Sequence, residues 1–126
     1  MIRVRRTVLA AAAFVAGAGG SLALVRPRRV VVEGASMEPT LSAGDRLLVV
    51  RRRRLSPGDI VALRDPRDGR RLLVKRVTSV VGNDVMVHGD NSAASTDSRA
   101  FGPVPRRAVV GRMVRRYGQG PVHGPR

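Results

Sequence analysis

Gly34-Ala35-Ser36-Met37-Glu38-Pro39-Thr40-Leu41 separates two β-type runs, VVV at residues 30–32 and DRLLVVR at residues 45–51. Pro39 excludes a long helix or a central strand through this point. The small residues before Ser36 leave room for another backbone to lie close to its hydroxyl. We therefore expect Ser36 on a rigid, exposed turn between two strands. Taken alone, a serine in such a place is most often part of an ordinary loop, so the rest of the chain must decide its role.

A single lysine is the second informative feature. The chain has 24 lysines and arginines, and Lys75 is the only lysine among them. Arginine keeps its proton in proteins, whereas lysine can lose it in apolar surroundings. In the run LLVKRV at residues 72–77, strand alternation places Lys75 on one face with Leu73 and Val77. Burial there lowers the pKa of the amine from about 10.4 towards neutrality, and a neutral amine can accept the proton of a serine hydroxyl.

The remaining runs are short, rich in valine and separated by turn sequences. We expect further strands at residues 60–63, 72–81 and 85–88 and within residues 103–114, and a polar loop at residues 89–102. This pattern predicts an all-β fold, a small barrel-like or sandwich catalytic domain of short antiparallel strands. Its expected limits are residues 30–116, and residues 117–126 read as a loose tail.

The N-terminal segment has the character of a membrane anchor. Residues 7–25 run for 19 positions without a charge, and three arginines stand on each side. This length is sufficient for one transmembrane helix. We expect residues 1–29 to form a cytoplasmic basic start plus a single anchor at about residues 7–25. A cleaved export signal remains the alternative.

Composition excludes several classes of function. The net charge of +15 raises nucleic acid or anionic lipid as a partner, but there are only three aromatic residues, which is too few for base stacking. The chain has no cysteine and no cluster of histidines and acids with metal-ligand spacing. No glycine-rich loop opens a helix. We expect no nucleic acid partner, no metal and no cofactor.

Four short sequences then occur in a characteristic order. They are SMEPTL at residues 36–41, GD at 44–45, KRV at 75–77, and GDN at 89–91 followed by STDSR at 95–99. Together they resemble the type I signal peptidase family, including the mitochondrial inner-membrane proteases, over about residues 30–114. The resemblance implies a serine endopeptidase that removes signal peptides from exported precursors through a Ser36 acyl-enzyme with Lys75 as general base. It also implies contact with membrane lipid, a location in the plasma membrane and a catalytic domain on the extracytoplasmic face.

The resemblance further assigns supporting residues. Ser95 would hydrogen-bond the catalytic amine, and Asp97 and Arg99 would brace the site. Strand alternation turns Arg76 away from Lys75, where it can pair with Asp90.

Other implied residues would bind the substrate and the reacting oxygen. Bacterial members often carry a hydroxyl where Gly34 stands, so the oxyanion hole would depend on backbone N–H groups at Ser36 and Gly34. The walls of the pockets that accept small side chains before the cut would be Val30, Val32, Met37, Leu41 and Leu73.

Three alternative functions stay open. The chain could be a dedicated maturation protease of the same family, such as those that trim nickel superoxide dismutase precursors. A self-cleaving protease of the SOS repressor type expects an N-terminal DNA-binding region, where this chain has an apolar run. A non-catalytic, membrane-anchored basic module would tolerate Lys75→Arg. His88 could form a triad with Ser36 and Asp90, although a lone histidine at a strand end is more often structural.

Overall fold

A computed structural model describes residues 26–52 and 54–120. The fold has little helix, namely the short α2 (Ser98–Phe101) and the 3-10 turns η1 (Ser92–Ala94) and η2 (Arg106–Ala108). The strands are β1 (Arg28–Val31), β2 (Arg46–Val50), β3 (Ile60–Asp65), β4 (Asp68–Val81), β5 (Asp84–His88), β6 (Val104–Pro105) and β7 (Val109–Gly118). The prediction of an all-β domain is confirmed.

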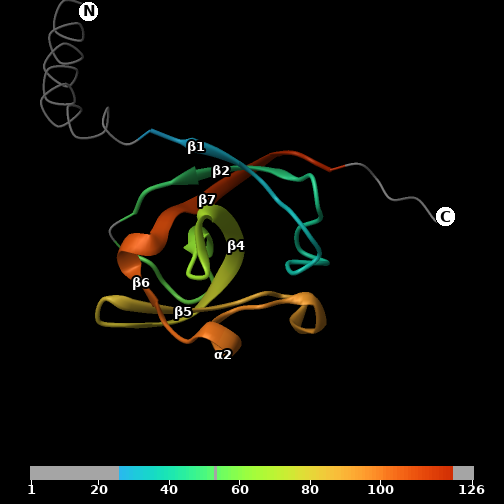
Figure 1. Ribbon diagram of the computed structural model, residues 1–126. Helices are drawn as coiled ribbons and strands as arrows, with labels where there is room; N and C mark the ends of the chain where they lie inside the picture. The colour runs from blue at the N-terminus through green and yellow to red at the C-terminus, as the bar shows by residue number, and fades with distance from the viewer. Residues whose placement is uncertain (1–25, 53, 121–126) are drawn as a thin grey trace, which may run out of the picture.

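All seven strands form one antiparallel sheet in the order β1-β2-β7-β3-β4-β5-β6. The sheet curves strongly: β1, β2 and β7 lie in the upper part of Figure 1, and β5 lies at the bottom. Register shifts in the pairing of β4 with β5, between Val77 and Ser79, mark a bulge that assists this curvature. The curvature leaves apolar residues on both sides of the central strands.

Two clusters of buried side chains form the core. Ile60 and Ala62 of β3 belong to the first, and Val61 and Leu63 belong to the second. Because β3 is buried on both faces, its sequence is continuously apolar rather than alternating. The neighbouring β4 also contributes to both clusters, and Val74 and Lys75 near its middle are both buried.

Several boundaries differ from the prediction. The strand carrying Lys75 starts at Asp68 rather than at residue 72, because a two-residue turn joins it to β3. The last strand continues to Gly118, where β7 pairs with Arg46 of β2. The Gly120 N–H then donates to Asp45, at 2.7 Å. The beginning of the expected tail is therefore held to the sheet.

The expected anchor at residues 7–25 lies outside the described residues. Across residues 26–52 and 54–120, no helix has the length and apolar character needed to cross a membrane.

Candidate active site

Ser36 lies on the turn that follows β1, as its flanking residues predict. Gly34 has a φ of +71°, a conformation that favours glycine. The next side chain, Met37, is fully buried, and Leu41 is nearly so. The Leu41 N–H donates to the Met37 carbonyl at 2.9 Å. These two apolar side chains fix the turn to the first core cluster and leave Ser36 half-buried at the surface.

Asn91 fastens the same turn from the other side. Its backbone N–H donates to the carbonyl of Ser36 at 2.8 Å, and its side-chain amide donates to the carbonyl of Ala35 at 3.1 Å. Residues more than fifty positions apart in the chain therefore hold the serine backbone in one place. Sequence reasoning did not select Asn91, although it belongs to the GDN sequence that supports the family resemblance.

Lys75 is buried near the middle of β4. Lys75 is only 3% exposed to solvent, and it shares a strand face with Leu73 and Val77, as strand alternation predicts. Burial lowers the pKa of the Lys75 amine. The negative charge of Asp97 acts in the opposite direction, and the positive charges of Arg67 and Arg99 lower the pKa further. The site therefore shifts the protonation equilibrium of the Lys75 amine towards the neutral form, which is the form that can accept a proton.

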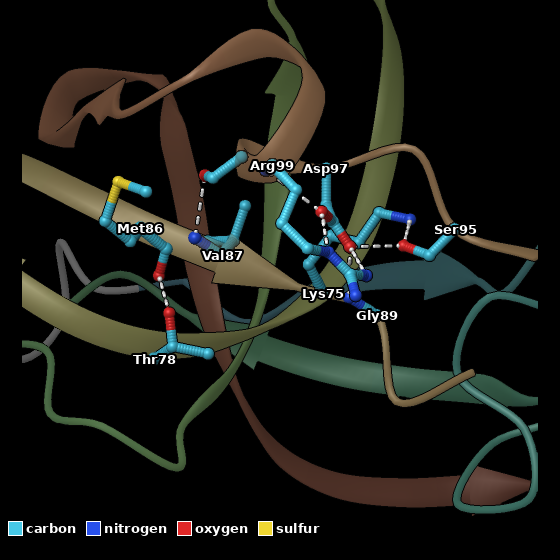
Figure 2. A network of polar contacts seen from close by, with 9 residues as sticks. Lys75, Thr78, Met86, Val87, Gly89, Ser95, Asp97 and Arg99 are labelled. Carbon is cyan, nitrogen blue, oxygen red and sulfur yellow. Dashed lines mark hydrogen bonds and ion pairs between the residues drawn. The ribbon is translucent and has the colours of Figure 1, made fainter. Parts of the chain in front are cut away.

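A chain of hydrogen bonds orients this amine (Figure 2). Lys75 Nζ donates to Ser95 Oγ at 3.0 Å, and the Ser95 hydroxyl donates to Asp97 Oδ2 at 2.6 Å. Asp97 is almost fully buried, and it also accepts from the Gly89 N–H at 2.9 Å and from Arg99 Nε at 2.8 Å. Burial would raise the pKa of Asp97, but the hydrogen bonds from Arg99, Ser95 and Gly89 together hold it well below the usual range.

Ser36 and Lys75 line one cleft of about 230 Å³. Leu73 lies in the same wall, together with Val31 and Glu33 from the chain that leads to the serine. Both catalytic candidates are within the described residues, and no direct hydrogen bond joins the Ser36 hydroxyl to the Lys75 amine there. Contacts of this kind often tighten only when the substrate binds.

The rear of the site is held by an ion pair. Arg76 donates to the two carboxylate oxygens of Asp90 at 2.9 and 2.8 Å, on the strand face opposite to Lys75. Asp90 also accepts from the Thr40 hydroxyl at 2.6 Å, which lies on the turn that carries Ser36. The hydrogen bond from Arg76 lowers the pKa of Asp90. This pair therefore links β4 to the serine turn, and the Thr40 contact was not expected from the sequence.

The expected substrate-pocket walls need a correction. Four of the five residues predicted to line the pockets are buried in the first core cluster and do not border the cleft, namely Val30, Val32, Met37 and Leu41. Strand alternation turns Val31 and Glu33 towards the cleft instead. Of the predicted wall residues, Leu73 is the one that borders the cleft.

A serine and a buried lysine lining one cleft of a small β domain are typical of hydrolases that pair these two residues. Comparison with known families agrees with this class: the chain belongs to the family described as signal peptidase, peptidase S26, which matches residues 1–88 and 78–117. The resemblance seen in the sequence is confirmed.

Several curated relatives are similar to this chain. Mitochondrial ATP-independent inner membrane protease subunit 1a of Arabidopsis thaliana is 35% identical over 112 residues, which cover 68% of this chain and 67% of the relative. Subunit 2 of Arabidopsis thaliana is 31% identical, covering 74% and 58%. Mitochondrial inner membrane protease subunit 1 of Homo sapiens is 30% identical, covering 67% and 65%. The matches span between 58% and 67% of the length of these relatives.

The expected location in the plasma membrane is wrong by this comparison. The relatives are named as proteases of the mitochondrial inner membrane. The reason for the error is that the resemblance covers both bacterial and mitochondrial members of the family, and the short sequences that carry it do not distinguish the two membranes.

Proposed function

We propose that this protein is a membrane-anchored serine endopeptidase that removes targeting peptides from precursor proteins, with Ser36 as nucleophile and Lys75 as general base. One observation carries the proposal above all others. The only lysine of the chain is buried in the cleft that Ser36 lines, and that burial lowers the pKa of its amine.

The hydrogen-bond chain supports the proposed role of Lys75. The Ser95 hydroxyl donates its proton to Asp97, so its oxygen can accept an N–H from the Lys75 amine. A neutral amine that donates to Ser95 keeps its lone pair free to accept a proton from elsewhere. In the proposed reaction Lys75 takes the Ser36 proton while Ser36 Oγ attacks the scissile carbonyl. Lys75 then protonates the leaving amine and activates water to hydrolyse the acyl-enzyme.

Backbone groups of the serine turn are the proposed donors to the oxyanion. Within the described residues, the N–H groups of Gly34 and Ser36 donate to no protein acceptor. Asn91 and the buried Met37 hold this turn, so the two donors are fixed before the substrate arrives. Fixed donors stabilise developing negative charge without reorganisation, and loss of one such donor costs about 3 kcal/mol of barrier.

The proposed substrate is an extended peptide with small side chains near the cut. The volume of about 230 Å³ and the apolar walls at Val31 and Leu73 support a small apolar residue in the cleft. An extended segment can pair with the chain before Ser36 as an added strand. A general peptidase of this kind would cleave many precursors, whereas a dedicated maturation protease would cleave one.

We propose that residues 7–25 anchor the domain in a bilayer, because this run has no charge and sufficient length. The names of the relatives favour the mitochondrial inner membrane for such an anchor. Alkaline extraction of membranes tests the anchor: release of the full chain into the soluble fraction would contradict it.

The nucleophile is tested with a panel of precursors and two serine variants. Ser36→Ala should abolish cleavage of every precursor, because the variant lacks the hydroxyl that is the proposed nucleophile. Ser42→Ala removes the same hydroxyl from a residue outside the cleft and should cleave like the wild type. Equal unfolding curves for the two variants establish that both are folded. Near-normal turnover by Ser36→Ala would overturn the proposal, and the number of precursors cleaved by the wild type distinguishes general from dedicated processing.

A further inference from the structure

A second, larger cavity lies away from the serine cleft. It measures about 870 Å³, and four separate parts of the fold contribute to it. These are the start of β1, the connection from β2 to β3, the β4–β5 turn, and η2 with the beginning of β7. All four meet on the left of the molecule in Figure 1, where β1 begins.

The lining of this cavity is strongly basic. Its arginines are Arg26, Arg28, Arg51, Arg52, Arg106 and Arg107. Asp84 is the single carboxylate among the lining residues, and none of the six arginines forms an ion pair within the described part of the chain. Some arginines outside the cavity do pair with carboxylates, as Arg76 does with Asp90 and Arg99 does with Asp97. The cavity therefore concentrates positive charge that the protein itself does not neutralise.

Arg106, one of the lining residues, has a donor group for which the described residues provide no acceptor. Its Nη2 atom has no accessible surface and no hydrogen-bond partner. The backbone N–H of Arg106 donates to the carbonyl of Asn83 at 2.7 Å, which fixes η2 against the β4–β5 turn. Guanidinium groups recognise phosphate oxygens through paired N–H donors. An oxyanion in the cavity would neutralise the surrounding charge.

The cavity also has an apolar side and lies at the beginning of the described chain. Leu55 and Val109 in its lining are buried members of the second core cluster. Arg26 follows directly on the uncharged run of residues 7–25, and Arg28 is two residues further on. Since a residue spans at most about 3.6 Å, Arg28 lies within about 11 Å of the end of that run. The headgroup layer of a bilayer is about 5–8 Å deep on each side, so this limit places Arg28 within that layer or within about 6 Å beyond it.

We propose that this cavity binds the phosphate-bearing headgroup of an anionic phospholipid and so holds the domain against the membrane surface. The proposal rests on the proposed anchor for its placement beside the bilayer. Lipid is favoured over nucleic acid because the lining combines arginines with aliphatic residues and has no aromatic side chain for base stacking. The serine cleft, which is lined by other residues, would then be held at a fixed distance from the bilayer.

The test measures lipid binding by the full chain in uncharged detergent micelles. The chain used in this test carries Ser36→Ala. Lipid binding needs no catalytic activity, so the result does not depend on whether Ser36 is the nucleophile. Short-chain phosphatidylglycerol, short-chain phosphatidylcholine and inorganic phosphate are titrated separately. Phosphatidylglycerol should bind more tightly than either of the others. Arg28→Gln and Arg106→Gln should each weaken that binding about fivefold, which corresponds to about 1 kcal/mol.

Arg115→Gln is the matched control, because it removes the same charge from an exposed residue outside the cavity. It should leave phosphatidylglycerol binding unchanged. If all three variants weaken phosphatidylglycerol binding equally, general surface charge explains the binding and the proposal is overturned. If phosphatidylcholine or inorganic phosphate binds as tightly as phosphatidylglycerol, the cavity is not a site for an anionic lipid headgroup. Tighter binding of an oligonucleotide that depends on the same two arginines would also overturn the proposal. If Arg106→Gln does not fold, the exposed Arg28→Gln decides the result.

Discussion

Replacing Gly89 by alanine adds one methyl group where the serine turn meets the segment that carries Ser95. Gly89 is buried, and a Cβ there would lie 2.6 Å from the Ser36 carbonyl oxygen and 2.6 Å from Ser95 Cβ, and still closer to Ser95 Oγ. Ordinary van der Waals contact begins at 3.4 Å, so the Ser36 carbonyl oxygen and Ser95 Cβ must each move by about 0.8 Å, and Ser95 Oγ must move further. The backbone at Gly89 is outside the positive-φ region, so the effect is one of space rather than of conformation.

The displacement affects both halves of the proposed catalytic pair. Ser36 carries the proposed nucleophile, and Ser95 accepts a hydrogen bond from the Lys75 amine. A misplacement of about 1 Å reduces catalytic rates by about 100-fold, or about 2.7 kcal/mol of barrier. Overpacking a buried position costs about 1–3 kcal/mol of stability. Gly89→Ala should therefore lose most of its activity while still folding at room temperature.

The assay compares kcat/KM for one precursor peptide with the free energy of unfolding in urea. Gly69→Ala is the matched control, because a Cβ at that position meets no atom within 4 Å. It should match the wild type in both measurements. Activity of Gly89→Ala within about threefold of wild type would refute the reasoning that one packed junction positions the nucleophile and the base.

Two further variants test the network around the site. Asp97→Asn should lower the free energy of unfolding by about 3 kcal/mol at neutral pH. Asp97 accepts hydrogen bonds from Gly89, Ser95 and Arg99 at its two carboxylate oxygens, whereas an asparagine amide has only one oxygen that accepts. Because the folded pKa of Asp97 is depressed, its stabilisation is present above about pH 3.9 and is lost as pH falls through the folded pKa. Urea unfolding should therefore show the difference from wild type shrinking in acid, and a constant difference would contradict the charge-based explanation. Arg76→Gln should cost about 1 kcal/mol in the same assay, since the pair with Asp90 is partly exposed. No measurable loss would mean that this pair does not hold the serine turn.

Much of the fold could be predicted because apolar periodicity reports burial directly. The apolar run at residues 60–63 predicted the short strand β3, and alternation along β4 placed Lys75 beside Leu73 and Val77. Alternation also turned Arg76 away from Lys75, where it meets Asp90. These features depend on spacing within one strand, which the sequence contains in full.

Features that join distant segments could not be predicted in the same way. Alternation separates Val30 and Val32 from Val31 and Glu33, but it does not say which set faces the core and which faces the cleft. The hydrogen bonds from Asn91 to the serine turn depend on packing across more than fifty residues. The basic cavity combines arginines from four parts of the fold, so no single stretch of sequence reveals it.

The role of Lys75 is the central claim, and the cleavage rate of Lys75→Arg tests it most directly. Arginine keeps the positive charge and most of the length, but it stays protonated at any working pH and cannot act as the base. Because burial depresses the pKa of Lys75 in the folded protein, wild-type activity should rise with pH through that value. The stability cost of the buried amine begins as pH falls below about 10.4 and is complete below the folded pKa.

The decisive number is the single-turnover rate of Lys75→Arg on one precursor, measured beside the wild type. We expect no detectable cleavage by this variant when its unfolding curve shows that it is folded. A rate within about tenfold of wild type, equivalent to about 1.4 kcal/mol of barrier, would contradict it.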